Sequence, residues 1–362
     1  MVYNLNNRTQ QTPHYMDSEY PRENEAGTSR GDVAEAPLVS VIMPSFNTAR
    51  FISQAIDSVL DQDYPQTELI VIDDGSTDGT VEAIRAYGDR VQLITQQNQG
   101  SAVARNTGLA AARGELIAFL DSDDVWLPGK LLTQVEYLRR NPQVDMVYGR
   151  WKVWKPESDG SFVPPHVAVS SEEAPPAMPG IVVEGSGWLY NRLLFASLLH
   201  TITVMARRRL IEAVGTFDTA LKRGQDYDYW IRASRVTEIH QIDRALACYR
   251  VHGDGCIRRW PRENYERIVV EKALARWGLE GPQGECTQAS GIRRRLAQIS
   301  FSFGYHQFWE GDPRLALQAF AHSATRQPSR RAAWRYLALS ALKVALPWRR
   351  AHQITAPGEW NP

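Results

Sequence analysis

Short, mostly apolar segments alternate with helical patterns between residues 38 and 148, and this alternation constrains the fold more than any other feature of the sequence. The apolar, β-branched segments predict buried strands at 38–43, 69–72, 91–95, 116–120 and 144–148. Between them, apolar residues recur every three or four positions at about 51–60, 78–87, 101–113 and 128–140, as on one face of a helix. This order predicts an α/β fold, a mostly parallel, Rossmann-like sheet with helices on both faces.

The second half of the chain is less regular. We expect a loop at 157–180, which is rich in Pro, Ser and Glu, a strand at 201–205, and one or two strands at 238–250. Helices are expected at 208–214 and 227–233, and Gly114 is expected to end the helix at 101–113 as a C′ glycine.

The composition excludes several classes of protein. Lys and Arg number 41, as do Asp and Glu, so no excess of positive charge drives binding to nucleic acid. Three cysteines, an odd number without a C-x-x-C pair, argue against a disulfide framework and favour the reducing cytoplasm. The sequence contains no run of about 18 apolar residues, so a membrane span is not expected. The polar segment 1–37 lacks the apolar stretch of a signal peptide and is expected to be disordered.

Acidic residues follow two of the predicted strands. Asp121-Ser122-Asp123 comes directly after the strand at 116–120, and its carboxylates are suitable ligands for Mg²⁺ or Mn²⁺, with a nucleotide diphosphate completing the coordination. Asp73 and Asp74 end the strand at 69–72, where an acidic side chain can hydrogen-bond a base or a ribose hydroxyl. A solvated acidic turn and a helix-capping turn are the ordinary alternatives for these two segments.

Four motifs in order resemble the family 2 glycosyltransferases. They are Val41-Ile42-Met43-Pro44-Ser45-Phe46-Asn47, Val71-Ile72-Asp73-Asp74-Gly75-Ser76-Thr77-Asp78-Gly79-Thr80, Asn98-Gln99-Gly100 with Ala104-Arg105-Asn106 and Gly108, and Phe119-Leu120-Asp121-Ser122-Asp123-Asp124. The resemblance runs from about Leu38 to His252 and implies the GT-A fold with inverting transfer from a nucleotide sugar, most simply a UDP-sugar.

The resemblance also implies donor-site residues. Asp73 and Asp74 match the positions that contact uracil or ribose, and Arg105 matches the arginine that approaches the nucleotide. Asp121, Ser122 and Asp123 match the D-x-D motif, with Asp123 the more direct ligand of Mn²⁺ or Mg²⁺. The first nucleotide loop carries the remaining expected donor contacts, which are Pro44, Ser45 and Asn47.

On the acceptor side, Gln225-Asp226 stands where the family often has Glu-Asp before an amphipathic helix. Asp226 is therefore the predicted general base, with Asp228 as an outside candidate or a solvated first-turn carboxylate. His252 lies in a segment that resembles the end of the family's domain. It is the third predicted metal ligand or a contact to the diphosphate, with a surface histidine as the ordinary alternative. Trp230 lines the acceptor site or packs in the core.

These assignments divide the chain into a polar tail (1–37), a GT-A domain with a nucleotide-binding half (38–125) and an acceptor half (126–255), and a helical region (256–362). In the last region, Gly304, Ala316, Phe320 and Pro328 have the spacing of a tetratricopeptide unit, which Trp334 and Leu337 continue. The match is partial, and both a small helical cap and an interaction module fit it.

The expected activity is addition of a single sugar to a carbohydrate or glycolipid acceptor during assembly of a surface polysaccharide, lipopolysaccharide or glycolipid. The protein is expected in the cytoplasm, with peripheral membrane contact through the basic cluster around Trp260 as an option. A dinucleotide-dependent oxidoreductase is disfavoured because no G-x-G-x-x-G follows the first strand. A non-catalytic nucleotide-sugar-binding or scaffold protein that uses the helical end is the second alternative.

Overall fold

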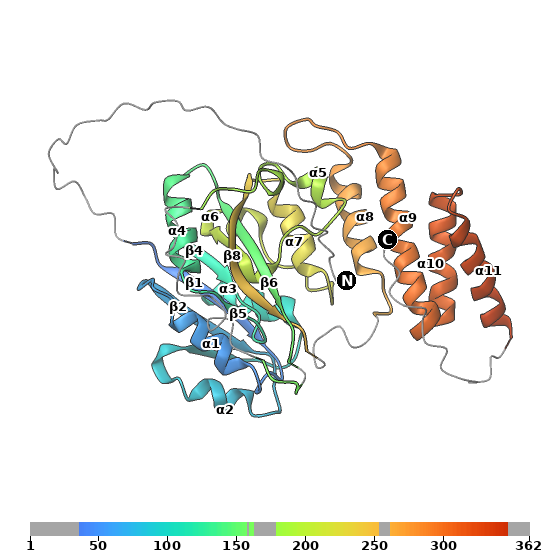
Figure 1. The fold of residues 1–362 in the computed structure, drawn as a ribbon. Helices are drawn as coiled ribbons and strands as arrows, with labels where there is room; N and C mark the ends of the chain where they lie inside the picture. The colour runs from blue at the N-terminus through green and yellow to red at the C-terminus, as the bar shows by residue number, and fades with distance from the viewer. Residues whose placement is uncertain (1–35, 158, 163–178, 253–260, 347–362) are drawn as a thin grey trace. The chain divides into compact units, whose positions relative to one another are not determined.

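The computed structural model describes residues 36–157, 159–162, 179–252 and 261–346. The described residues from Pro37 onward form one compact unit built on an eight-stranded sheet with the order β3-β2-β1-β4-β7-β6-β8-β5. Figure 1 shows this sheet with its surrounding helices. The polar tail expected to be disordered lies outside the described residues, apart from its last two positions.

One half of the sheet is parallel. Strand β1 (Val39–Ser45) lies between β2 (Thr67–Asp73) and β4 (Leu116–Phe119), and β3 (Gln92–Thr95) continues from β2 at the edge. The side chains of β1 alternate between two apolar clusters: Ile42 belongs to one, and Val41 and Met43 belong to the other. Because both faces are buried, the strands are almost continuously apolar, as predicted.

Helices cover both faces of this half. Helix α3 contributes Ala102 and Ala104 to the cluster of Ile42, whereas α1 and α4 contribute Ile56 and Leu131 to the opposite one. The predicted α/β fold with helices on both faces is confirmed. The helices of this half are α1 (Ile52–Leu60), α2 (Thr80–Arg85), α3 (Ser101–Ala111) and α4 (Lys130–Arg140).

The other half of the sheet mixes directions. Strand β7 (Met205–Arg207) is antiparallel to both β4 and β6 (Met146–Trp154), β8 (Ile239–Arg250) runs parallel to β6, and β5 (Val125–Trp126) pairs antiparallel with β8. The segments between these strands carry short elements: η2 (Val183–Gly185), α5 (Tyr190–Leu193), η3 (Thr201–Thr203), α6 (Arg208–Val214) and α7 (Gln225–Ala233).

Two local predictions are wrong. The strand expected at 201–205 begins only at Met205, because side chains occupy the preceding carbonyls: Trp126 Nε1 donates to Ile202 O and Gln134 Nε2 to Thr203 O, each at 2.8 Å. Gly114 is not the C′ residue of α3, which ends at Ala111. A Cβ at Gly114 would lie 2.5 Å from the carbonyl oxygen of Leu38, so close approach to β1 explains the glycine.

The C-terminal region is helical, as predicted, with α8 (Tyr265–Trp277), α9 (Ala289–Glu310), α10 (Pro313–Arg326) and α11 (Arg331–Ala345) following one another in Figure 1. Val270 of α8 and Leu296 of α9 join the main core, while Phe301 and Phe320 centre a separate cluster between α9, α10 and α11. No helix in the described part of the chain combines the length and apolar character needed to cross a bilayer. Cys248 and Cys286 are free thiols, and Cys256 lies outside the described residues.

Candidate active site

Hydroxyl groups connect the ends of β1 and β4. Ser45, the last residue of β1, lies 2.9 Å from Thr48 through their hydroxyl oxygens, and Thr48 Oγ1 donates to Ser122 Oγ at 3.1 Å. Ser45 and Ser122 are both buried. Ser45 and Ser122, both predicted to contact the donor nucleotide, therefore link the two strand ends, and their hydroxyls form hydrogen bonds within the protein.

Asn47 connects the loops after β1 and β2. Its backbone is left-handed (φ 52°), a conformation that asparagine tolerates better than most residues. The side-chain oxygen accepts the N–H of Thr77 at 2.8 Å, and its own N–H donates to Ser76 Oγ at 2.8 Å. Pro44, directly before Ser45, lies within β1 opposite Ile72. Both residues shape the loop at the carboxyl ends of the strands.

The two adjacent aspartates after β2 differ in their surroundings. Asp74 is buried, and its two oxygens accept hydrogen bonds from Gln96 Nε2 (2.7 Å), Gln99 N (3.0 Å) and Gly100 N (2.7 Å). Asp73 is also buried; Oδ2 accepts two backbone N–H groups of the following turn, whereas Oδ1 has no hydrogen-bond partner among the described residues. Asp74 therefore holds the loop before α3, and Asp73 retains an acceptor for a ligand.

Helix α3 and the D-x-D segment meet through an ion pair. Arg105 Nη2 lies 2.6 Å from Asp121 Oδ1, and the guanidinium is almost fully buried over the ring of Phe217. A buried arginine that faces a carboxylate provides a strong, oriented positive charge at this strand end. The arrangement places a cation where the sequence predicts the nucleotide, and it engages one oxygen of Asp121.

Asp123 is paired with the predicted histidine. Asp123 Oδ2 lies 3.0 Å from His252 Nε2, and the imidazole packs on Phe51 with ring centroids 4.5 Å apart. Adjacent ligands of an octahedral ion with bonds of about 2.1 Å stand about 3 Å apart, so this oxygen and nitrogen fit one Mn²⁺ or Mg²⁺. Among the described residues no three His, Cys, Asp or Glu side chains surround a common metal position, and Asp121 turns to Arg105 instead.

Arg250 and Asp124 fasten the end of β8 to the D-x-D segment. The backbone N–H of Arg250 donates to Asp124 Oδ1 at 2.7 Å, and its Nε donates to the carbonyl oxygen of Asp123 at 2.7 Å. Burial, reinforced by Asp123 and Asp121, raises the pKa of the Asp124 carboxyl well above its usual range. Burial lowers the pKa of Arg250 to about 10. Arg250 is thus engaged with local groups, and its position sets that of His252.

Asp226 lies in the first turn of α7, because this helix begins at Gln225, two residues before the predicted start. Its Oδ1 accepts the N–H of Tyr227 at 2.8 Å, and its Oδ2 accepts the hydroxyl of Thr201 at 3.2 Å. The residue is only partly buried, so the carboxylate remains accessible to a ligand. The contact with Thr201 brings the start of α7 to η3, whose carbonyls are held by Trp126 and Gln134.

Sequence reasoning missed His200, which directly precedes η3. Its imidazole lies near Trp151 and Tyr249, with ring centroids 5.3 Å and 4.9 Å apart. Burial lowers the pKa of this histidine, while the carboxylates of Asp121, Asp226 and Asp123 act in the opposite direction. His200 therefore lies close to both predicted sets of acidic residues, and no sequence motif marked it.

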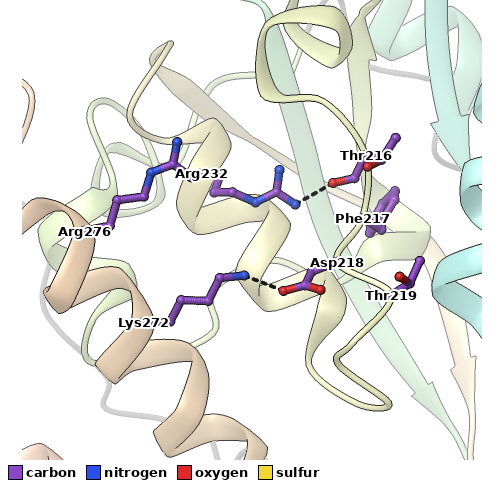
Figure 2. Close-up of a pocket in the computed structure, with 7 residues that line it drawn as sticks. All are labelled: Thr216, Phe217, Asp218, Thr219, Arg232, Lys272 and Arg276. Carbon is purple, nitrogen blue, oxygen red and sulfur yellow. Dashed lines mark hydrogen bonds and ion pairs between the residues drawn. The ribbon is translucent and has the colours of Figure 1, made fainter.

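Two acceptor-side alternatives are decided by burial. Asp228 is not a solvated carboxylate: it is buried and bonded to Arg232 (2.9 Å) and Lys272 (2.7 Å). These two cations help line a polar pocket of about 350 Å³ between the 216–219 segment, α7 and α8, where Lys272 also reaches Asp218 (Figure 2). Trp230 is a core residue, 1% exposed. The ion pairs of Lys272 with Asp218 and Asp228 therefore connect α8 to the rest of the domain.

Comparisons with known proteins identify a family and several relatives. Residues 40–184 match the model of glycosyl transferase family 2. The chain is 32% identical over 219 residues to an uncharacterized glycosyltransferase, RT0329, of Rickettsia typhi. These residues cover 60% of this chain and 65% of that protein. The match thus spans less than two thirds of that relative.

A second relative has a stated reaction. The Escherichia coli enzyme WfgD, a UDP-Glc:alpha-D-GlcNAc-diphosphoundecaprenol beta-1,3-glucosyltransferase, is 34% identical over 214 residues, 58% of this chain and 75% of that enzyme. Residues 1–349 of Staphylococcus aureus TarS, solved with UDP-GlcNAc, superpose with a TM-score of 0.57 at 20% identity over 85% of this chain and 90% of that one, which shows a shared fold. With its D-x-D motif at the end of β4 and the sheet of the family's GT-A fold, this chain belongs to glycosyl transferase family 2.

Proposed function

We propose that this protein is an inverting glycosyltransferase that moves a single sugar from a UDP-sugar to an acceptor hydroxyl during assembly of a surface polysaccharide, lipopolysaccharide or glycolipid. The donor nucleotide is supported by WfgD, which uses UDP-Glc, and by TarS, which binds UDP-GlcNAc. The acceptor class is supported by WfgD, whose acceptor is a sugar on a diphospholipid.

In this proposal the carboxyl ends of β1, β2 and β4 hold the nucleotide. Asp73 offers its unpaired Oδ1 to an N–H of the base or a ribose hydroxyl, and Asp74 keeps the loop before α3 in place. Arg105 and Asp121 form an oriented pair beside the diphosphate. Buried donors and acceptors of fixed direction give a nucleotide site its specificity.

Asp123 and His252 are the proposed protein ligands of a divalent cation. A cation bound there supplies Lewis-acid stabilisation of the charge on the departing diphosphate. Asp124 and Arg250 position this pair without binding the cation, because their hydrogen bonds fix the backbone next to Asp123 and His252.

Asp226 is the proposed base. During inversion the acceptor oxygen attacks the anomeric carbon, its proton passes to a carboxylate oxygen of Asp226, and the bond between that carbon and the diphosphate oxygen breaks on the opposite face. The observation that carries the proposal is convergence at one turn. Thr201 donates to Asp226 of α7 at 3.2 Å, and the charges of Asp121 and Asp123, which follow β4, act on the imidazole of the preceding residue, His200. Inversion requires the leaving group on one side of the transferred sugar and the base on the other.

The proposal is tested first with nucleotides. We expect UDP with Mn²⁺ to raise the melting temperature more than GDP, CDP, dTDP or NAD, and Asp123→Ala to remove the dependence on Mn²⁺. Asp226→Asn should retain UDP binding and lower transfer from UDP-glucose to a GlcNAc-diphospholipid by about 10²–10⁴-fold. Asp243→Asn, which changes a half-exposed ion pair with Arg150, is the control. Full transfer by Asp226→Asn would contradict the assigned base.

A further inference from the structure

The imidazole of His200 has aromatic neighbours and an unused polar atom. Trp151 comes from β6 and Tyr249 from β8, and both rings are tilted by 51° against that of His200. Nδ1 is buried and has no hydrogen-bond partner among the described residues. Buried side-chain nitrogens are usually paired, so an orphan in an acidic, aromatic site points to a missing ligand group.

The backbone around His200 is held firmly. Its carbonyl oxygen accepts the N–H of Thr203 at 2.9 Å and the hydroxyl of Thr203 at 2.8 Å. The next residue, Thr201, donates to Asp226 Oδ2. The imidazole is therefore presented from a rigid turn that also contacts the proposed base, and its position is fixed relative to the site.

We propose that His200 binds a hydroxyl group of the transferred sugar, with Trp151 and Tyr249 as apolar walls beside that sugar. This inference rests on the proposed function and adds a residue that determines donor-sugar specificity. Aromatic rings bind the apolar C–H faces of pyranoses, and a polar group placed between them orients the hydroxyls.

The charges around His200 favour the transferred sugar over the nucleotide. The carboxylates that act on the ring are Asp121 and Asp123 on the donor side and Asp226 on the base side. Only the sugar in transit lies between these two groups during inversion, whereas the nucleotide contacts β1 and β2. The lowered pKa keeps the ring neutral at pH 7, so one nitrogen donates and the other accepts.

The experiment compares the dissociation constants of UDP and of one UDP-sugar by calorimetry, with Mn²⁺ present. The sugar is whichever of UDP-glucose, UDP-galactose and UDP-N-acetylglucosamine the wild-type protein binds most tightly. We expect His200→Phe to weaken binding of the UDP-sugar by about tenfold relative to UDP, because the hydrogen bond is lost. His200→Asn, which keeps a donor and an acceptor, should retain more of the preference.

His240→Asn is the matched control, because this histidine is also partly buried. Its ring lies 2.7 Å from Tyr137 Oη, at the end of β8 opposite to Tyr249. An unchanged ratio of the two constants in both His200 variants would overturn the inference while leaving the UDP-sugar enzyme intact. A wild-type protein that binds neither UDP nor any UDP-sugar would instead contradict the proposed donor. Because the ratio is taken within one protein, loss of stability alone does not change it.

Discussion

At the scale of residues, Asp73 and Asp74 show how neighbouring identical side chains acquire different tasks. We expect Asp73→Asn to weaken UDP binding with little loss of stability, because the amide oxygen can replace Oδ2 toward the turn while the NH₂ group replaces the free Oδ1 acceptor. Calorimetric titration with UDP measures the effect on binding, and a denaturant melt measures the effect on stability.

Asp74→Asn is expected to behave in the opposite way. Three N–H groups point at its two oxygens, so an NH₂ group would face at least one donor and lower the free energy of unfolding by about 1–3 kcal/mol. Equal losses of stability in the two variants would contradict this difference, and unchanged UDP binding in Asp73→Asn would show that its free Oδ1 does not contact the nucleotide.

Lys130 predicts a dependence of stability on pH. The ammonium group is fully buried 3.9 Å from the ring centroid of Trp126, and burial lowers its pKa well below the usual value. Between this lowered pKa and about 10.5 the unfolded chain therefore binds more protons than the folded one, and in that range the free energy of unfolding rises with pH by up to about 1.4 kcal/mol per unit.

Lys130→Met should make that rise less steep between pH 7 and 10, as urea melts at several pH values would measure. The exposed Lys152→Met should leave the slope of the wild-type protein unchanged. A slope that is identical in Lys130→Met would mean that the buried amine keeps its usual affinity for protons.

The motifs of the sequence predicted the strand-end residues because their spacing is local: each group follows its own strand within a few positions. Three residues predicted as ligand contacts form hydrogen bonds within the protein. Ser45 and Ser122 both bond to the hydroxyl of Thr48, and the side-chain oxygen of Asn47 accepts the N–H of Thr77. His200 could not be predicted, because its aromatic neighbours come from β6 and β8, which only the folded chain brings together. The neighbours Trp126 and Gln134 of Lys130 are local, but the sequence does not show that this lysine is fully buried.

At the scale of elements, helix α3 depends on a close approach to the sheet. A Cβ at Gly108 would lie 2.5 Å from Ile42 Cγ2 and 2.7 Å from Ile72 Cδ1. We expect Gly108→Ala to lower stability by about 1–3 kcal/mol because α3 must move away from β1 and β2. The movement also shifts Arg105, one turn earlier, so UDP binding should weaken.

A denaturant melt and a UDP titration check this expectation, with Ala110→Ser at an exposed position of the same helix as the control. Unchanged UDP binding in Gly108→Ala would show that the pair of Arg105 and Asp121 does not depend on the close packing of α3 against the sheet.

Helices and strands were predictable where the apolar pattern was long. They were less predictable where side chains, instead of a neighbouring strand, donate hydrogen bonds to the backbone carbonyls. The parallel strands β1, β2 and β4 follow from their apolar, β-branched runs. The turn η3 does not, because Trp126 and Gln134 lie about 70 residues earlier and no local pattern reports that they bond to its carbonyls. The length of β6 was underestimated, since Arg150 and Lys152 are exposed residues that continue the strand.

At the scale of the whole molecule, the described helices of the C-terminal region belong to two cores. Val270 and Leu296 lie in the main cluster, whereas Phe320 is fully buried between α9, α10 and α11. We expect Phe320→Ala to cost about 3–5 kcal/mol within the small cluster and to speed amide exchange in α10 and α11, while exchange in β1 and β2 and binding of UDP stay near the wild-type level.

The comparison for that measurement is Val270→Ala, which removes buried volume from the main cluster and should speed exchange in α7 and α8. If Phe320→Ala speeds exchange across the sheet as well, the two cores unfold as one unit. The sequence predicted helices here from composition and spacing, but the division of α9 between two cores depends on packing between distant segments.

The short strand β5 links chemistry to solubility. It follows Asp124 immediately and bonds to Ala247 and Cys248, so it covers part of the outer edge of β8, whose other end is covered by bridges from Ile181 and Gly187. An uncovered edge would offer unpaired backbone groups to strands of other chains. We therefore expect variants that loosen the segment from Asp121 to Trp126 to expose this edge and to aggregate in cells, in addition to disturbing the D-x-D residues.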